Sequence, residues 1–383
     1  MSLISRLSAR LQNHPKRVVF PEGADPRIIQ AARQFVTKKL GVPILIGDRQ
    51  RIKITAARLN ISLEGIRVIE PERSDELTNY TEKLASIQRY GNTNLQGDPR
   101  ELVKNPSYFA CIMVATAGAD ALISGATTHA ASGLRAILQT MPRQAGVETV
   151  SSMLILESEE ARFGCDGVLF LADCGVIPEP TAEQLADIAV TTAGLAGHLT
   201  NTTPKVALLA YSTHSANARL ASIKKVQAAT EMAKRKAREL GIVADIDGEM
   251  QADAALNPFA AESKEVTGSV AGKASVLIFP DLNSGNIASK MAQHIADIPA
   301  YGQILTGLER PAAEISRGAS AHDIFGTAVI VAAQAVDNFL DFSHFPFVHA
   351  GTFGSDKDLL VTDYTTERGE DGWGFVVKYP HLI

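Results

Sequence analysis

Short apolar runs alternate with longer segments of helical periodicity along most of this 383-residue chain. This alternation limits the possible folds more than any other feature of the sequence. The runs predicted to be strands are Val18–Phe20, Ile44–Ile46, Ile66–Ile69, Asp120–Ile123, Val168–Ala172, Val206–Tyr211, Val243–Ile246 and Val276–Phe279. The segments predicted to be helices are Ile28–Leu40, Leu102–Ala117, Leu134–Thr140, Ala182–Leu199, Ala216–Leu240 and Ile287–Ile295. Such alternation is typical of βαβ units with strands buried on both faces, so we expect an α/β protein with a mostly parallel sheet.

The length of the chain predicts two such lobes, because a single hydrophobic core rarely grows beyond about 250–300 residues. Ligands of open α/β sheets bind outside the carboxyl ends of the strands, so we expect a functional cleft between the lobes. The helix starting near Ala182 has a clear start signal, since Thr181 is followed three residues later by Gln184, the pattern of a capping box.

Charge and cysteine content exclude several classes of protein. The net charge of −5 argues against a general nucleic-acid binder, and the apolar run Ile324–Ala333 is too short to cross a membrane. Three cysteines are few and odd in number, so no disulfide framework is expected and a reducing compartment fits. Leu3, Leu7 and Leu11 recur at helical spacing, which favours an amphipathic first helix over a targeting signal. We therefore expect a cytoplasmic protein.

Small and polar residues follow several of the predicted strands, where they could form turns around an anion. These segments are Phe20–Asp25, Ser124–His129, Asp173–Cys174, Ser212–Ser215 and Pro280–Asn286. Backbone N–H groups in such turns bind phosphate well, although the same residues are also the commonest turn and cap residues. Several such segments with arginines nearby favour a phosphate-handling cleft. The sequence has no P-loop motif and no well-placed dinucleotide fingerprint.

The segment from Glu314 to Asp323 has the sharpest combination of chemical groups. Arg317 offers a planar fork for a phosphoryl group and Ser316 a neighbouring hydroxyl. Asp323 can serve as a base. The spacing of Ser320 and Asp323 is equally typical of a cap at the start of the helix that follows, so both roles are open for this carboxylate.

These residues resemble the active-site signature of the phosphate acetyl/butyryltransferase family, in particular of its acetyl-transferring branch. The likeness runs from about residue 1 to residue 336. The other segments that match in order are Phe20–Gly23, Asp120–Ala126, Leu171–Cys174, Tyr211–Thr213, Asp247–Gln251 and Phe279–Asn286. The resemblance implies two α/β lobes, the second inserted in the first: residues 1–149 with 302–383, and residues 150–301. It also implies a homodimer and a cleft for coenzyme A.

The activity implied by the resemblance is acetyl-CoA + phosphate ⇌ coenzyme A + acetyl phosphate, without a covalent acyl-enzyme. By resemblance, Asp323 is the base for the coenzyme A thiol, Arg317 holds the acyl phosphate, and Ser316 stabilises the oxyanion. No metal and no tightly bound cofactor is expected. The implied partners are small-molecule substrates, with no nucleic acid and no membrane. Two alternatives stay open: a non-catalytic module of the same fold that senses acetyl-CoA, and an enzyme for propionyl or butyryl groups.

The resemblance also predicts residues that contact coenzyme A. They are Arg135, Arg89, Ser212, Thr213 and Cys174. Arg135 has a surface charge as its alternative role, and Cys174 that of a small buried hydrophobic residue. The segment around Arg89 is less basic than is usual in the family. From about residue 338 the likeness fades, and Leu359–Tyr364 with Trp373–Tyr379 predict a β-hairpin, as packing against the first lobe or as an interaction surface.

Overall fold

The computed structural model describes residues 1–90, 97–215, 219–340, 364–369 and 372–377. For residues 89, 90, 337–340 and the last two ranges, only the backbone is described. The chain divides into two compact units, Met1–Val336 and Asp337–Ile383. All described elements of the candidate site belong to the first unit.

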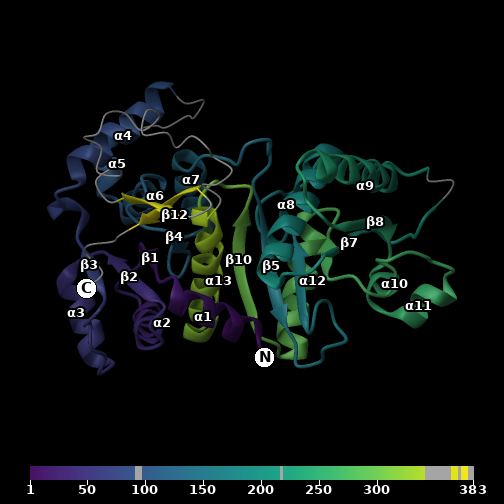
Figure 1. The fold of residues 1–383 in the computed structure, drawn as a ribbon, viewed down its shortest axis with the longest axis horizontal. Helices are drawn as coiled ribbons and strands as arrows, with labels where there is room; N and C mark the ends of the chain where they lie inside the picture. Colours follow the sequence, from purple (N-terminus) through teal and green to yellow (C-terminus); the bar gives the residue numbers. More distant parts are fainter. Residues whose placement is uncertain (91–96, 216–218, 341–363, 370–371, 378–383) are drawn as a thin grey trace. The chain divides into compact units, whose positions relative to one another are not determined.

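The described part of the first unit is built on one eleven-stranded sheet (Figure 1). The strand order across the sheet is β3-β2-β1-β4-β11-β10-β5-β6-β9-β7-β8. In chain order the strands are β1 (Lys16–Phe20), β2 (Gly41–Ile46), β3 (Arg67–Ile69), β4 (Ala121–Ser124), β5 (Ser151–Glu157), β6 (Val168–Ala172), β7 (Lys205–Leu209), β8 (Asp245–Met250), β9 (Val276–Ile278), β10 (Ala300–Thr306) and β11 (Ala312–Glu314).

Two parallel halves of this sheet run in opposite directions. Strands β3, β2, β1, β4 and β11 are parallel to one another, and so are β6, β9, β7 and β8. Between the halves, β10 pairs antiparallel with β11 and with β5, and β5 pairs antiparallel with β6. Three antiparallel pairings reverse the direction, so the carboxyl ends of the two halves lie at opposite edges of the sheet.

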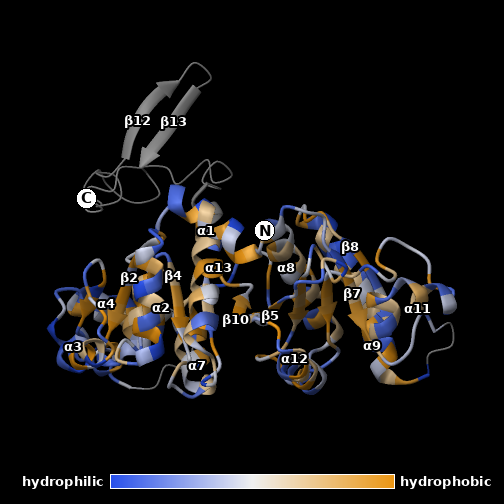
Figure 2. Cartoon of the chain, turned by 90° about the horizontal axis from the view of Figure 1, so that it is seen from below, coloured by the Kyte–Doolittle hydropathy of each residue, from blue (hydrophilic) through white to orange (hydrophobic). Residues whose placement is uncertain are grey.

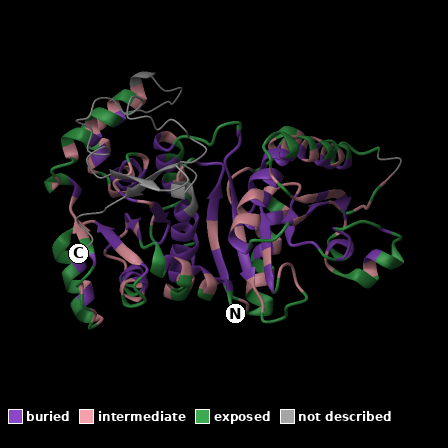
Figure 3. Cartoon of the chain, in the orientation of Figure 1, coloured by how far each residue is buried: buried purple, intermediate pink, exposed green. Residues whose placement is uncertain are grey.

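Helices cover both faces of the sheet. They are α1 (Leu3–Asn13), α2 (Pro26–Thr37), α3 (Arg49–Arg58), α4 (Leu77–Tyr90), α5 (Pro99–Lys104), α6 (Pro106–Ala115), α7 (Ala130–Thr140), α8 (Ala182–Thr200), α9 (Ala221–Glu239), α10 (Ala252–Leu256), α11 (Pro258–Ser263), α12 (Leu282–Ala296) and α13 (Ala321–Leu340), with a 3₁₀ turn, η1, at Pro71–Arg73. Most strand residues are buried and apolar (Figures 2 and 3).

One core runs continuously over one face, and two separate cores lie on the other. The continuous core joins α1, α2, α8, α9 and α13 across both halves of the sheet. On the opposite face, α4 to α7 pack on the first half and α10 to α12 on the second. Alternate residues of β1 show this division, since Val18 and Phe20 belong to the continuous core and Val19 to the other face.

The α/β fold class predicted from the sequence is confirmed, and each predicted strand overlaps an observed one. The predicted helix Leu102–Ala117 is wrong as a single element. Asn105 caps a new helix at Pro106, because proline fits the first turn of a helix but not its interior. Strands β5, β10 and β11 were not predicted. The division into residues 1–149 with 302–383 and 150–301 stays a prediction.

The described part of the second unit is an antiparallel hairpin of β12 (Tyr364–Gly369) and β13 (Gly372–Val377). The predicted hairpin is confirmed, but its first strand begins at Tyr364 instead of ending there. The rest of the predicted strand Leu359–Tyr364 lies outside the described residues. Among the helices that the structure describes, none combines the length and the apolar character of a membrane-spanning segment.

Candidate active site

The loops that follow the neighbouring parallel strands β1, β4 and β11 meet at one edge of the sheet. Arg27, in the first turn of α2, forms polar contacts with all three loops. Its guanidinium donates to the carbonyl oxygens of Arg317 (2.6 Å), Ala319 (2.9 Å) and Ala126 (2.7 Å), and it pairs with Asp25 at 2.9 Å. Because Arg27 uses these donors within the protein, it fixes the backbone that carries Ser316 and Arg317.

The loop after β4 already holds an anion, the carboxylate of Glu22. Its Oε2 accepts from the N–H of Ala126 (2.7 Å), and its Oε1 accepts from the N–H of Thr127 (2.9 Å) and Thr128 (2.6 Å). The sequence left open whether this loop binds a phosphate or is an ordinary turn. An internal carboxylate occupies these three N–H groups, so they are not available to a phosphate.

The segment after β11 presents Ser316 and Arg317 to solvent. Within the described ranges, the Arg317 guanidinium makes no hydrogen bond or ion pair, whereas its carbonyl oxygen is held by Arg27. The Ser316 Oγ atom accepts a long hydrogen bond, 3.3 Å, from the N–H of Gly318. An exposed guanidinium on a fixed backbone is suited to binding a phosphoryl group in a bidentate manner.

Asp323 lies in the first turn of α13 and takes part in its cap. Its Oδ2 accepts from the N–H of Ser320 at 2.9 Å, and the Ser320 Oγ accepts from the N–H of Asp323 at 3.1 Å. The structure thus bears out the capping role that the spacing predicted. Asp323 is partly exposed, so a capping carboxylate can still be reached from solvent.

Sequence reasoning missed Glu314, the last residue of β11. Its side chain is only 6% exposed, and it accepts a short hydrogen bond from the Ser124 hydroxyl on the neighbouring strand. Burial, together with the nearby charge of Glu22, raises the pKa of Glu314 to about 8, against the lowering effect of the Ser124 bond. One acidic residue in the apolar run Ala312–Ile315 was the sequence signal that could have revealed it.

Arg135 and Arg89 lie on helices near the same half of the sheet. Arg135 is exposed on α7, and its charge lowers the pKa of Tyr108 on α6, although burial raises that pKa overall. Arg89 belongs to α4, but its side chain lies outside the described residues. Their contacts with coenzyme A stay predictions.

The other predicted coenzyme A contacts follow strands of the second half, so they lie at the opposite edge of the sheet from Ser316. Ser212 donates to the buried carboxylate of Glu249 at 3.0 Å, and Thr213 accepts from the N–H of Gln251 at 3.0 Å. Cys174 is fully buried, and burial raises the pKa of its thiol to about 12. The structure therefore does not bring these three residues together with Ser316, and it supports the alternative packing role of Cys174.

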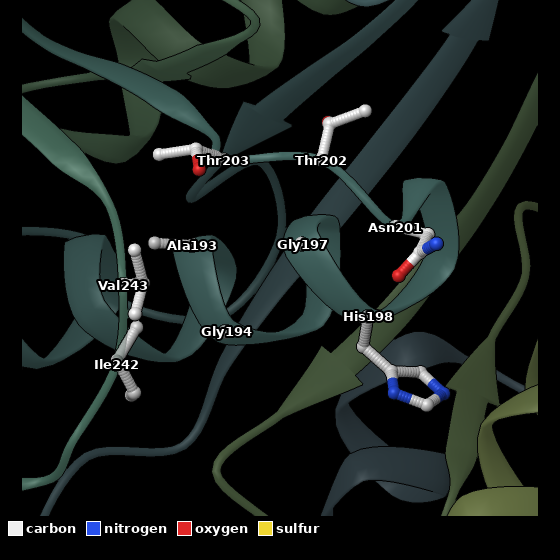
Figure 4. A pocket seen from close by; sticks show the side chains of 9 residues that line it. All are labelled: Ala193, Gly194, Gly197, His198, Asn201, Thr202, Thr203, Ile242 and Val243. Atoms are coloured by element: carbon white, nitrogen blue, oxygen red, sulfur yellow. The ribbon is translucent and has the colours of Figure 1, made fainter.

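The pocket in Figure 4 is distant in sequence from the candidate site. It has a volume of about 390 Å³. It is lined by α8, the segment between α8 and β7, and the segment before β8: Ala193, Gly194, Gly197, His198, Asn201, Thr202, Thr203, Ile242 and Val243. None of the predicted site residues lines this pocket. No cluster of metal-binding side chains is found within the described ranges.

Comparisons with known proteins agree with the motifs of this edge. Residues 2–332 match the family model described as phosphate acetyl/butaryl transferase, and residues 332–380 match that of the vanillate O-demethylase oxygenase C-terminal domain. The phosphate acetyltransferase of Acetivibrio thermocellus is 38% identical over 335 residues, covering 88% of this chain and 98% of that protein. That of Bacillus subtilis is 33% identical over 334 residues, covering 87% and 99%.

Solved structures of two phosphotransacetylases share the fold. The EutD phosphotransacetylase from Staphylococcus aureus has a TM-score of 0.77 at 33% identity, covering 87% of this chain and 98% of that one. A phosphotransacetylase from Streptococcus pyogenes has a TM-score of 0.78 at 32% identity, covering 88% and 98%. With the family model matching most of its length, the chain is a transferase that belongs to the phosphate acetyl/butyryl transferase family.

Proposed function

We propose that this protein is a phosphate acetyltransferase that exchanges an acetyl group between coenzyme A and inorganic phosphate at the edge formed by β1, β4 and β11. The exposed Arg317 guanidinium on a backbone fixed by Arg27 is the observation that best supports this site. The named relatives support acetyl as the acyl group.

The proposed reaction is a direct attack of the coenzyme A thiolate on the carbonyl carbon of acetyl phosphate. The thiol proton passes to Asp323, because a thiol with a pKa of about 8.5 is largely protonated at neutral pH. A C–S bond forms, the bond between the carbonyl carbon and the bridging oxygen of the phosphate breaks, and phosphate leaves with the electron pair of that bond. Arg317 neutralises the phosphate charge, while the Ser316 hydroxyl donates to the carbonyl oxygen as it becomes negative. The reverse direction uses the same groups.

The first test is turnover by the purified protein, measured as acetyl-CoA formed from coenzyme A and acetyl phosphate. Replacing Arg317 with Ala should lower kcat/KM by about 10²-fold or more, since one lost charged contact to a transferring group typically has such an effect. Arg58→Ala, on the exposed face of α3, removes the same charge elsewhere and serves as control. A clean protein that binds coenzyme A without turnover would instead support the acetyl-CoA sensor.

A second pair of variants separates the two roles of Asp323. Asp323→Asn keeps an oxygen that can accept from the N–H of Ser320 but removes the basic carboxylate, so kcat should fall by about 10²–10⁴-fold with little loss of stability. Ser320→Ala removes the other half of the cap and should lower stability by about 1 kcal/mol with little effect on kcat. If Asp323→Asn is fully active, the carboxylate is only a cap.

We also propose the two lobes implied by the resemblance, residues 1–149 with 302–383 and residues 150–301. The reversal of strand direction at β10 and β5 supports a division near these two strands, because it separates two sets of parallel strands. The proposed boundary at residue 302 falls inside β10. The homodimer stays a prediction from the resemblance.

A further inference from the structure

Glu314 is a buried acid directly beside the proposed catalytic segment, and the proposed mechanism does not use it. Strand β11 pairs in parallel with β4 so that Glu314 lies opposite Ser124, and the N–H of Ile315 donates to the Ser124 carbonyl at 2.7 Å. The side chain repeats this link, since Ser124 Oγ bonds to Glu314 Oε2. Glu314 thus joins the loop after β4 to the segment that carries Ser316.

Two glycines shape the space around this carboxyl group. A Cβ atom on Gly133 would lie 2.5 Å from both carboxyl oxygens, and one on Gly125 would lie 3.0 Å from Oε1 and 2.2 Å from the carbonyl oxygen of Ile315. The absence of these side chains lets α7 and its preceding loop approach Glu314 closely. The site is therefore built tightly around the acid.

The surroundings favour the uncharged form of the acid. Glu314 Oε1 is buried and has no hydrogen-bond partner within the described residues. Besides burial, the charge of Glu22 raises the pKa of Glu314. On α6, burial raises the pKa of the Cys111 thiol, and a charge on Glu314 would raise it further. A neutral carboxyl group leaves one uncharged oxygen without a partner, whereas ionisation would bury a charged one.

We propose that Glu314 is a positioning residue, which as a neutral acid holds the segment 315–318 against the loop after β4 and on ionisation releases it. The inference rests on the proposed function of Ser316 and Arg317, which this segment carries. Ionisation would leave a charged Oε1 buried without a partner among the described residues, although the Ser124 hydroxyl binds the charged form more tightly. Opening the segment to water relieves this cost. Release would move Ser316 and Arg317 away from the groups they act with.

The pH dependence of Glu314→Gln tests the proposal. Glutamine has the shape of the neutral acid and cannot ionise, so this variant should stay active where the unsubstituted protein loses activity. With a pKa of about 8, only about one tenth of Glu314 stays neutral at a pH of about 9. The ratio of kcat/KM, variant over unsubstituted protein, should therefore rise about tenfold between a pH of about 7 and about 9. The coenzyme A thiol titrates equally in both proteins and cancels in the ratio.

Two further variants complete this experiment. Glu309→Gln changes an exposed acid five positions earlier and should give a ratio that does not change with pH. Glu314→Ala removes the contact altogether and should lose at least tenfold in kcat/KM at neutral pH, with glutamine restoring it. A ratio for Glu314→Gln that is constant across this pH range would overturn the proposal, whether or not Glu314→Ala folds.

A measurement without turnover separates this inference from the proposed function. Amide hydrogen exchange of residues 315–319, corrected for its intrinsic pH dependence, should become about tenfold faster above a pH of about 8 in the unsubstituted protein and not in Glu314→Gln. This result would support the positioning role even in the absence of acetyl transfer. The absence of acetyl transfer would refute only the proposed function. Equal exchange in both proteins would refute the positioning role.

Discussion

The buried acid at the end of β11 makes a quantitative prediction about stability. In the folded protein the pKa of Glu314 is raised from 4.5 to about 8, chiefly by burial. Between these values the folded state holds one proton more than the unfolded chain, so the free energy of unfolding falls as pH rises. Below this window both states are protonated, and above it both are ionised. The linkage amounts to about 1.4 kcal/mol per pH unit inside the window.

Glu314→Gln removes this linkage, because an amide does not titrate. From a pH of about 5 to about 7.5, the free energy of unfolding of the variant should therefore rise by about 2–3 kcal/mol relative to that of the unsubstituted protein. Urea unfolding followed by circular dichroism at several pH values measures this difference, with Glu309→Gln as the exposed control. Parallel curves for the Glu314 variant and the unsubstituted protein would mean that Glu314 is ionised in the folded state, and the reasoning would be refuted.

Three further changes test other parts of the structure. Gly133→Ala places a methyl group 2.5 Å from both oxygens of Glu314 and should lower the free energy of unfolding by about 1–3 kcal/mol. This loss should be smaller in a Glu314→Ala background, and an equal loss in both backgrounds would contradict the contact. Cys174 is fully buried and its pKa is raised to about 12, so in the folded protein iodoacetamide should modify the partly exposed Cys165 first. Mass spectrometry measures this order, and earlier modification of Cys174 would contradict its burial. Thr181→Ala breaks the capping box with Gln184 and should lower stability by about 1 kcal/mol without changing kcat, whereas an unchanged melting temperature would argue against that cap.

The sequence correctly predicted those helices and strands whose apolar residues repeat with a single period and whose ends carry cap or turn residues. The capping box at Thr181 and the apolar strands at Val168 and Val276 are examples, because local preference and burial agree there. Strands β5, β10 and β11 escaped prediction for local reasons. Strand β11 has three residues, and the pairing of β10 with β5 is irregular between Tyr301 and Ile304, which interrupts the alternation expected of a strand.

These three strands matter for the predicted site, because they contain the antiparallel pairings that reverse the sheet. Ser212, Thr213 and Cys174 were predicted to contact coenzyme A by resemblance alone. The reversal places them at the opposite edge of the sheet from Ser316. The motif singled out Ser316, Arg317 and Asp323 as candidates, and their roles stay predictions. Glu314 interrupts a short apolar run, which is a weak signal, and its significance comes from the burial that the structure shows.

The pairing of β11 with β4 has a consequence for the biogenesis of the protein. Ser124 and Glu314 touch although 190 residues separate them in the chain. Closing a loop of that length in an otherwise unstructured nascent chain has an entropic cost of about 4–5 kcal/mol, and prior folding of the intervening segment lowers it. During synthesis on the ribosome, the edge that carries Arg317 can therefore assemble only after nearly the whole first unit has emerged. Stalled or prematurely ended products would hold the loop after β4 without the strand that completes it.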